Sequence, residues 1–100
     1  MGAEISLTGI QVRAARTMLG MTQEQLAQLS LVSLPTIKDF EKDLRKPHVR
    51  TVRDLKRTLE EQGIVFLAPE DGSIGVLLTA EARARLAAAG GDAEAEEAGR

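Results

Sequence analysis

Apolar residues recur with a helical period through the first two thirds of the chain. The spacing i, i+3, i+7, which places side chains on one face of a helix, occurs at Val12, Ala15 and Leu19, and again at Val52, Leu55 and Leu59. Two shorter segments between them carry apolar residues where two crossed helices need them. The pattern predicts four helices, over residues 9–19, 23–30, 34–41 and about 49–62.

Hydroxyl side chains stand just before three of these helices. Thr8, Thr22 and Ser33 are plausible N-caps, because a hydroxyl oxygen can accept a hydrogen bond from a backbone N–H of the first turn. Gln25 follows Thr22 by three residues and completes a capping box. Pro35 falls in the first turn of the third helix, where a missing N–H costs little.

The pattern changes after residue 63. Two short apolar runs, 64–68 and 76–79, flank a turn segment at 69–75, which predicts a β-hairpin. A lone hairpin is marginal in water, so the strands need a partner, either the helical domain or the same hairpin in a second subunit. The residues we assign to a dimer interface are Ile64, Val65, Phe66, Leu67, Val76, Leu77 and Leu78.

The chain divides into three expected parts. Residues 1–68 form the helical domain with the first hairpin strand. Residues 69–89 hold the return strand and a short Ala- and Arg-rich helix, which we interpret as a dimerisation element. Residues 90–100 are acidic and lack large apolar side chains, so we expect a disordered tail.

The amino-acid composition limits which kinds of site and which classes of protein are possible. The chain has no cysteine and a single histidine, His48, which excludes a disulfide framework or thiolate metal site and disfavours a zinc site or His-based triad. No apolar run approaches the ~20 residues of a membrane span, and no basic segment followed by an apolar one marks a signal peptide. We expect a cytoplasmic protein that is not an enzyme, needs no cofactor and does not enter a membrane.

The net charge of −2 hides an asymmetry. Residues 1–68 hold ten Lys/Arg and eight Asp/Glu, a balance of +2, whereas residues 69–100 hold three and seven, a balance of −4. The basic excess is densest over residues 34–57, where eight bases accompany four acids. A basic face beside an acidic tail suits a protein that meets a polyanion with one side, although a solvated helix surface is the plainer interpretation.

The second and third predicted helices are joined by a three-residue turn, which is the arrangement of a helix-turn-helix and indicates DNA binding. Residues throughout this region match the pattern of the Xre/Cro-like helix-turn-helix regulators, the group that includes the lambdoid phage repressors. The matches are Arg16, Gly20, Thr22-Gln23, Leu26-Ala27, Val32-Ser33, Thr36-Ile37 and Glu41. The chain resembles this family from about Val12 to Gly63.

The resemblance implies a mainly α fold, a four-to-five-helix lambda-repressor-like domain to which this chain adds a C-terminal β-hairpin. It also implies an ion pair between Arg16 and Glu41, which lie on different helices. The implied partner is double-stranded DNA, bound by a homodimer.

Several residues of the motif and its flanks are candidates for DNA contact. Gln23 opens the second helix, where a side chain and the helix N-terminus together can hold a phosphate; a plain capping role is the alternative. Basic side chains after Thr36 can reach the phosphates that flank the major groove. The full set is Gln23, Ser33, Leu34, Pro35, Thr36, Lys38, Asp39, Lys42, Arg45, Lys46 and Arg50.

The chain departs from the family pattern in three ways. Leu31 stands in the turn where glycine is usual and φ is commonly positive, so a leucine there costs roughly 1 kcal/mol or forces a different turn. Leu34 and Pro35 cannot donate to a base edge, although they can contact thymine methyl groups. Asp39 repels phosphate but can accept a hydrogen bond from cytosine.

We therefore expect a sequence-specific transcriptional regulator, a repressor that acts as a homodimer by occluding its operator. The alternative is an antitoxin or antiactivator that uses the same fold to bind a partner protein, for which Leu31 and Leu34 offer a small apolar patch.

Overall fold

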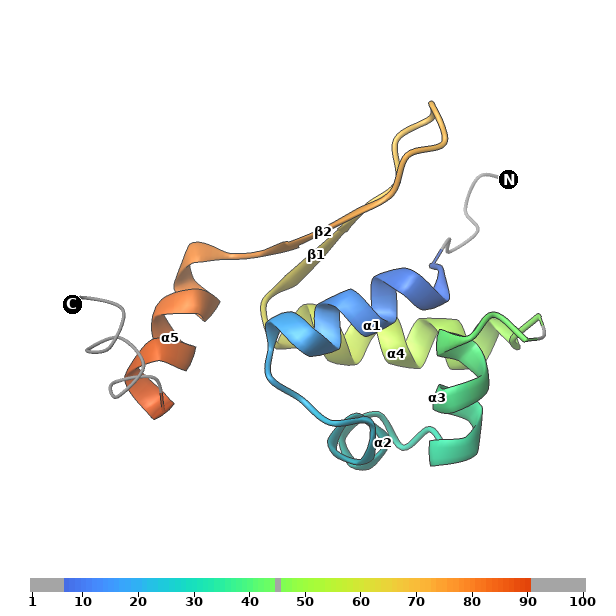
Figure 1. Cartoon of the computed structure of the whole chain (residues 1–100), viewed down its shortest axis with the longest axis horizontal. Coiled ribbons are helices and arrows are strands. Elements are labelled where there is room, and N and C mark those ends of the chain that lie inside the picture. The colour runs from blue at the N-terminus through green and yellow to red at the C-terminus, as the bar shows by residue number, and fades with distance from the viewer. Residues whose placement is uncertain (1–6, 45, 91–100) are drawn as a thin grey trace.

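The computed structural model describes residues 7–44 and 46–90 of the chain. Figure 1 shows four helices packed together, followed by a hairpin and a last helix. The elements are α1 (Gly9–Met18), α2 (Gln23–Ser30), α3 (Leu34–Glu41), α4 (Val49–Glu61), β1 (Ile64–Leu67), β2 (Gly75–Leu78) and α5 (Ala80–Gly90). The mainly α fold with an added hairpin is confirmed, and each expected element is present with ends that differ by one residue or less.

The predicted caps set the starts of the first three helices. The Thr8 hydroxyl accepts from the N–H of Gln11, whose side chain accepts from the N–H of Thr8. Thr22 and Gln25 form the second capping box, as the sequence indicated. Ser33 accepts from the N–H of Thr36, with proline in the first turn. These bonds satisfy backbone donors that a helix N-terminus otherwise leaves unpaired.

The core lies between α1, α2, α3 and α4. Its fully buried members include Val12, Leu26, Ile37 and Leu55, one from each helix. Val12 and Leu55 belong to the two i, i+3, i+7 stripes that predicted α1 and α4. Because Phe40 and Phe66 are the chain's two aromatic residues, aliphatic packing supplies most of this core.

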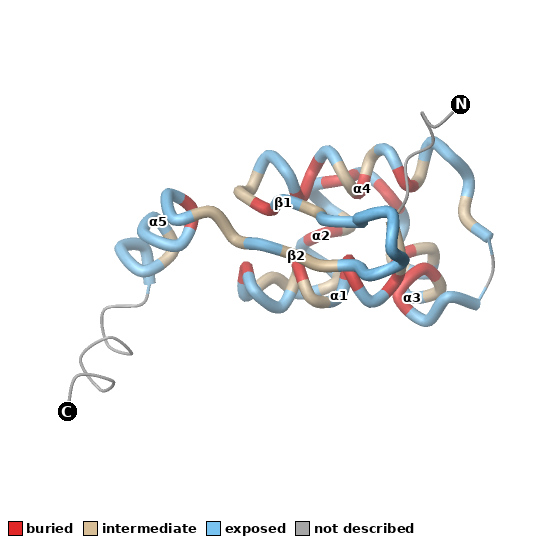
Figure 2. Tube along the Cα trace, turned by 90° about the horizontal axis from the view of Figure 1, so that it is seen from above, coloured by how far each residue is buried: buried red, intermediate tan, exposed pale blue. Residues whose placement is uncertain are grey.

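The hairpin covers α1 and α4 on the side away from α2 (Figure 1). Its strands are antiparallel, with Ile64 opposite Leu78 and Phe66 opposite Val76. In Figure 2, β1 runs nearer α4 and β2 nearer α1, which agrees with the contacts between these elements. The helical domain of the same chain is therefore a partner of the hairpin, one of the two options that the sequence left open.

A buried glutamine ties the hairpin to α1. The Gln11 side-chain amide donates to the carbonyl oxygens of Leu67 and Gly75, each at 3.0 Å. These two residues are paired across the hairpin, so one amide holds both strands. Gln11 therefore has two structural roles, in the cap of α1 and in holding the hairpin. Neither role was predicted from the sequence.

Helix α5 is attached at the junction of α4 and β1. The N–H of Thr79 donates to the carbonyl of Gly63 at 2.9 Å, and Ala82 is buried where a side chain on Gly63 would otherwise lie. Arg85 donates to the carbonyl of Gln62 at 2.9 Å. Beyond these contacts most of α5 is exposed, and it projects from the helical domain (Figure 1). The acidic tail expected to be disordered lies outside the described residues, apart from Gly90.

Within the described residues, no helix is long and apolar enough to cross a membrane.

Candidate nucleic-acid interface

The turn between α2 and α3 has the backbone geometry that its place in the motif requires. Leu31 has φ 63° and ψ 22°, in the left-handed region, and its N–H donates to the carbonyl of Ala27 at 2.9 Å. The next residue, Val32, is buried, and its N–H donates to the Ser30 hydroxyl at 3.2 Å. Of the two alternatives for Leu31, the structure therefore has the positive φ and not a different turn, at a steric cost of about 1–2 kcal/mol.

Helix α3 has one face in the core and one face outside it. Ile37, Phe40 and Glu41 are buried. The opposite face carries Pro35, Lys38, Asp39 and Lys42, which follow an i, i+3, i+4, i+7 spacing. We call these four residues the outer stripe of α3. Its members are exposed apart from Asp39, which is partly buried, so the stripe is the surface of this helix that a partner can reach.

An ion pair orients α3 against α1. Arg16 Nε lies 2.8 Å from Glu41 Oε2, and Arg16 Nη2 lies 3.0 Å from Glu41 Oε1. A third guanidinium bond reaches the carbonyl of Met21 at 2.9 Å, just before α2. The hydrogen bond to Glu41 raises the pKa of Arg16 above its ordinary value. The pair implied by the resemblance is therefore present, and it links α1, α3 and the start of α2.

Gln23 joins the same network, which the sequence analysis did not foresee. Its side-chain amide donates to Glu41 Oε1 at 3.1 Å. The contact of Gln23 with phosphate stays a prediction, and in this structure the amide instead links α2 to the end of α3. The first turn of α2 also carries Glu24, an exposed carboxylate that phosphate would repel.

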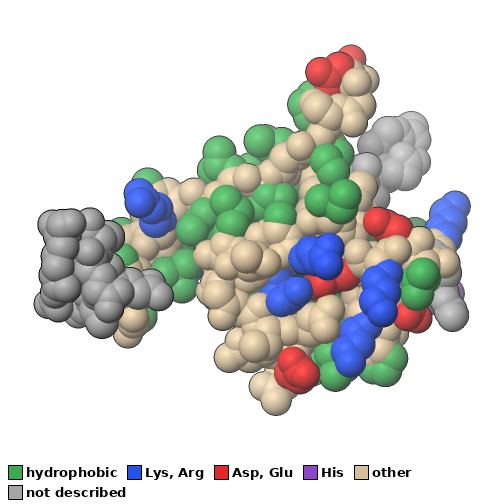
Figure 3. All heavy atoms as spheres, viewed as in Figure 1, with side chains coloured by type: hydrophobic (Ala, Val, Ile, Leu, Met, Phe, Trp, Pro, Cys, Tyr) green, Lys and Arg blue, Asp and Glu red, His purple; other side chains and the backbone are tan. Residues whose placement is uncertain are grey.

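Basic side chains surround the outer stripe. Figure 3 shows Lys and Arg side chains gathered over α1 and α3, with carboxylates among them. Lys38, Lys42, Lys46 and Arg50 are exposed, as a contact with phosphate requires, whereas the predicted Arg45 lies outside the described residues. The sequence analysis missed Arg13, an exposed cation of α1. Its i, i+3 spacing from Arg16 was the signal available.

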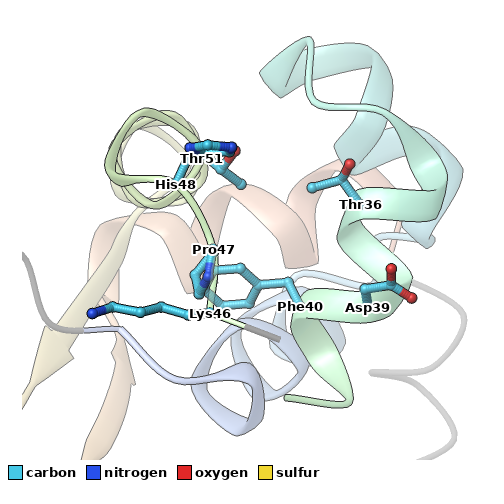
Figure 4. A pocket seen from close by; sticks show the side chains of 7 residues that line it. All are labelled: Thr36, Asp39, Phe40, Lys46, Pro47, His48 and Thr51. Carbon is cyan, nitrogen blue, oxygen red and sulfur yellow. The ribbon is translucent and has the colours of Figure 1, made fainter. Parts of the chain in front are cut away.

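A small hollow lies between α3 and the start of α4 (Figure 4). Its volume is about 200 Å³, and its lining residues are Thr36, Asp39, Phe40, Lys46, Pro47, His48 and Thr51. His48 is the N-cap residue of α4, but its side chain makes no capping hydrogen bond. Small-molecule sites usually measure 300 Å³ or more, so we interpret the hollow as the edge of the α3 surface rather than a ligand pocket. The described residues contain no cluster of three or more His, Asp and Glu residues able to hold a metal ion.

The structure divides the proposed dimer residues between two faces of the hairpin. Ile64 is 2% exposed and belongs to the core, and Phe66, Val76 and Leu78 pack against that core. Val65, Leu67 and Leu77 are exposed on the other face. Side chains alternate between the faces of a strand, so the seven residues cannot act as one interface. Ile64 in particular is already covered by its own chain.

Other exposed apolar residues lie on α1 and in the turn before β2. Ile10, Met18 and Ile74 are also exposed, and they line a shallow hollow of about 430 Å³ between α1 and β2. We call Ile10, Met18, Val65, Leu67, Ile74 and Leu77 the α1–hairpin apolar surface. Figure 3 shows apolar side chains gathered along the hairpin on the side seen there.

A family model described as helix-turn-helix matches residues 12–62, about half of the chain. This range begins in α1 and ends just after α4, so it covers the four packed helices and leaves out the hairpin and α5. No curated protein matches the chain.

Proposed function

Because this chain belongs to the Xre/Cro/C1-type family of helix-turn-helix proteins, we propose that it is a sequence-specific repressor that binds its operator as a homodimer. The family is one of DNA-binding regulators and not of enzymes. Repression by occlusion requires only that the bound protein cover a promoter, so the DNA-binding domain itself supplies the activity.

The outer stripe of α3 carries this proposal. Core packing and the ion pair with Arg16 use the opposite face of the helix, so the stripe keeps two exposed lysines, Lys38 and Lys42, for DNA. A recognition helix lies in the major groove with its N-terminal residues at the base edges. In that orientation the lysines further along α3 are placed to neutralise phosphates.

We propose a homodimer because one copy of the protein can contact only one half-site. A single α3 covers one half-site, and two-fold operators place half-sites about 34 Å apart, one helical turn. We assign the contact between copies to the α1–hairpin apolar surface, which lies on the other side of α1 and α4 from α2. A second copy bound there leaves the outer stripe of α3 uncovered.

A gel-shift titration with the DNA upstream of the gene tests the proposal. We expect binding at low salt that weakens steeply as salt rises, because displaced counterions drive association. Lys38→Ala and Lys42→Ala should each weaken binding and flatten the salt dependence by about one unit of slope. Arg83→Ala, an equal change of charge on α5, is the matched control and should leave both unchanged. Absence of binding by the wild type at low salt overturns the proposal.

The α1–hairpin apolar surface also favours a second candidate, a regulator that holds a partner protein, such as an antitoxin or antiactivator. Single exposed apolar residues are ordinary, but a contiguous group often marks an interaction site. Co-expression with the products of neighbouring genes distinguishes the two candidates. A stable complex that replaces the homodimer supports the partner protein, and a homodimer that excludes those products supports the repressor.

A further inference from the structure

The first turn of α3 presents hydrocarbon where hydrogen-bond donors would be expected on a recognition helix. Pro35 is exposed and has no N–H. Leu34 is partly exposed and does not belong to the residues that form or cover the core. Leu31, in the turn just before, is 89% exposed. Three apolar side chains therefore lie at or just before the end of α3 that leads into a groove.

The polar groups of this turn are engaged with one another. The Ser33 hydroxyl donates to the Thr36 hydroxyl at 2.8 Å and accepts from the Thr36 N–H at 3.3 Å. These bonds cap the helix, and breaking them to reach a base would expose the N-terminus of α3. The capping bonds thus commit the Ser33 O–H donor to the helix, and the Thr36 side chain is partly buried whereas Pro35 beside it is exposed.

The lysines beside this apolar surface determine which kind of partner can cover it. Lys38 and Lys42 follow Pro35 on the same stripe, three and seven residues on, so a partner that covers Pro35 also lies beside two ammonium groups. DNA is such a partner, because it is a polyanion whose major groove presents one apolar group, the 5-methyl of thymine. A neutral protein surface would leave the two charges without a counterpart.

We propose that Leu34 and Pro35 determine specificity by packing against thymine methyl groups in the major groove. This inference rests on the proposed DNA binding and names what the DNA must contain. The operator then carries thymines opposite the first turn of α3.

The experiment uses full-length protein and duplexes selected by it from a random pool. Each thymine of the selected site is replaced in turn by deoxyuridine, which removes the methyl group and keeps the base pair. At the contacted thymines we expect wild-type affinity to fall about fourfold, because one buried methyl-sized group contributes about 0.8 kcal/mol. The other thymines should show no change.

Substitutions test whether Pro35 and Leu34 make the contacts with the thymine methyl groups. Pro35→Ala places a good helix former at this exposed position. It should lower the thymine-to-uridine affinity ratio toward one. Leu34→Ala should do the same at a neighbouring base. Lys38→Ala is the control, and it should weaken binding to both duplexes while keeping the ratio.

Each result decides between the ideas. Equal affinity of the wild type for thymine and uridine duplexes overturns the methyl readout and leaves the proposed function standing. An unchanged ratio in both Pro35→Ala and Leu34→Ala overturns the assignment to these residues. If the selection yields no DNA at all, the proposed function fails and the readout fails with it.

Discussion

Arg16 on α1 and Glu41 at the end of α3 are joined by two hydrogen bonds, which makes this ion pair the main polar link between the first helix and the recognition helix. Glu41 is 8% exposed, so its charge depends on its partners for solvation. Loss of one partner leaves a buried charge without compensation, whereas the pair as a whole stabilises little against an apolar replacement.

We expect Arg16→Ala to lower the free energy of unfolding by about 3 kcal/mol, because Glu41 then stays buried without its cation. Urea denaturation followed by circular dichroism measures the change. Arg13→Ala removes an exposed cation from the same helix and should shift stability by less than about 0.5 kcal/mol. The double replacement Arg16→Met with Glu41→Leu should recover most of the loss, and equal stability of the two single arginine variants would contradict the role of the pair.

Leu31→Gly should stabilise the protein. The left-handed conformation costs leucine about 1–2 kcal/mol, and glycine avoids that cost but loses about 0.4–1 kcal/mol through greater freedom of the unfolded chain. We expect a net gain of roughly 0.5–1 kcal/mol by chemical denaturation. Leu29→Gly, at an exposed leucine inside α2, is the control and should destabilise by about 1 kcal/mol. A loss of stability in both variants would show that Leu31 makes a favourable contact.

Gln11→Met should loosen the hairpin. The substitution keeps the length of the side chain but removes the amide that holds the carbonyls of Leu67 and Gly75. An unsatisfied buried acceptor costs about 1–3 kcal/mol. Hydrogen exchange should therefore quicken at the amides of β1 and β2 more than at those of α2 and α3. Gln28→Met, at an exposed position of α2, is the matched control, and equal exchange in the two variants would refute the tether.

The exposed face of the hairpin should govern self-association. Wild-type protein is expected to elute as twice the chain mass of 10.8 kDa in size-exclusion chromatography with light scattering. Leu67→Asp and Leu77→Asp place a charge on the α1–hairpin apolar surface and should give monomers with an unchanged far-ultraviolet spectrum. Leu29→Asp adds the same charge to α2 and should leave the dimer intact. A monomeric wild type would remove the dimer from the proposed function.

Local sequence features were enough to predict the helices. The capping residues Thr8, Thr22 and Ser33 each bond a backbone N–H three positions away, and each apolar stripe marks one face of one helix. Such interactions are complete within a few residues, which is why the element ends were predicted to within one residue. The ion pair was predicted differently, through the resemblance to the family.

Tertiary contacts decided what no local pattern carries. Gln11 meets the hairpin across 56 and 64 positions of the chain, and Gln23 donates to Glu41 across 18. The hairpin residues read as one apolar group in the sequence, yet packing on α1 and α4 buries Ile64 and exposes Leu67. By itself, the sequence determined a helix-turn-helix frame with an unusual apolar start to α3. Only the folded chain decided which polar groups were already paired and which surfaces stayed exposed, because pairing and burial depend on residues far apart in sequence.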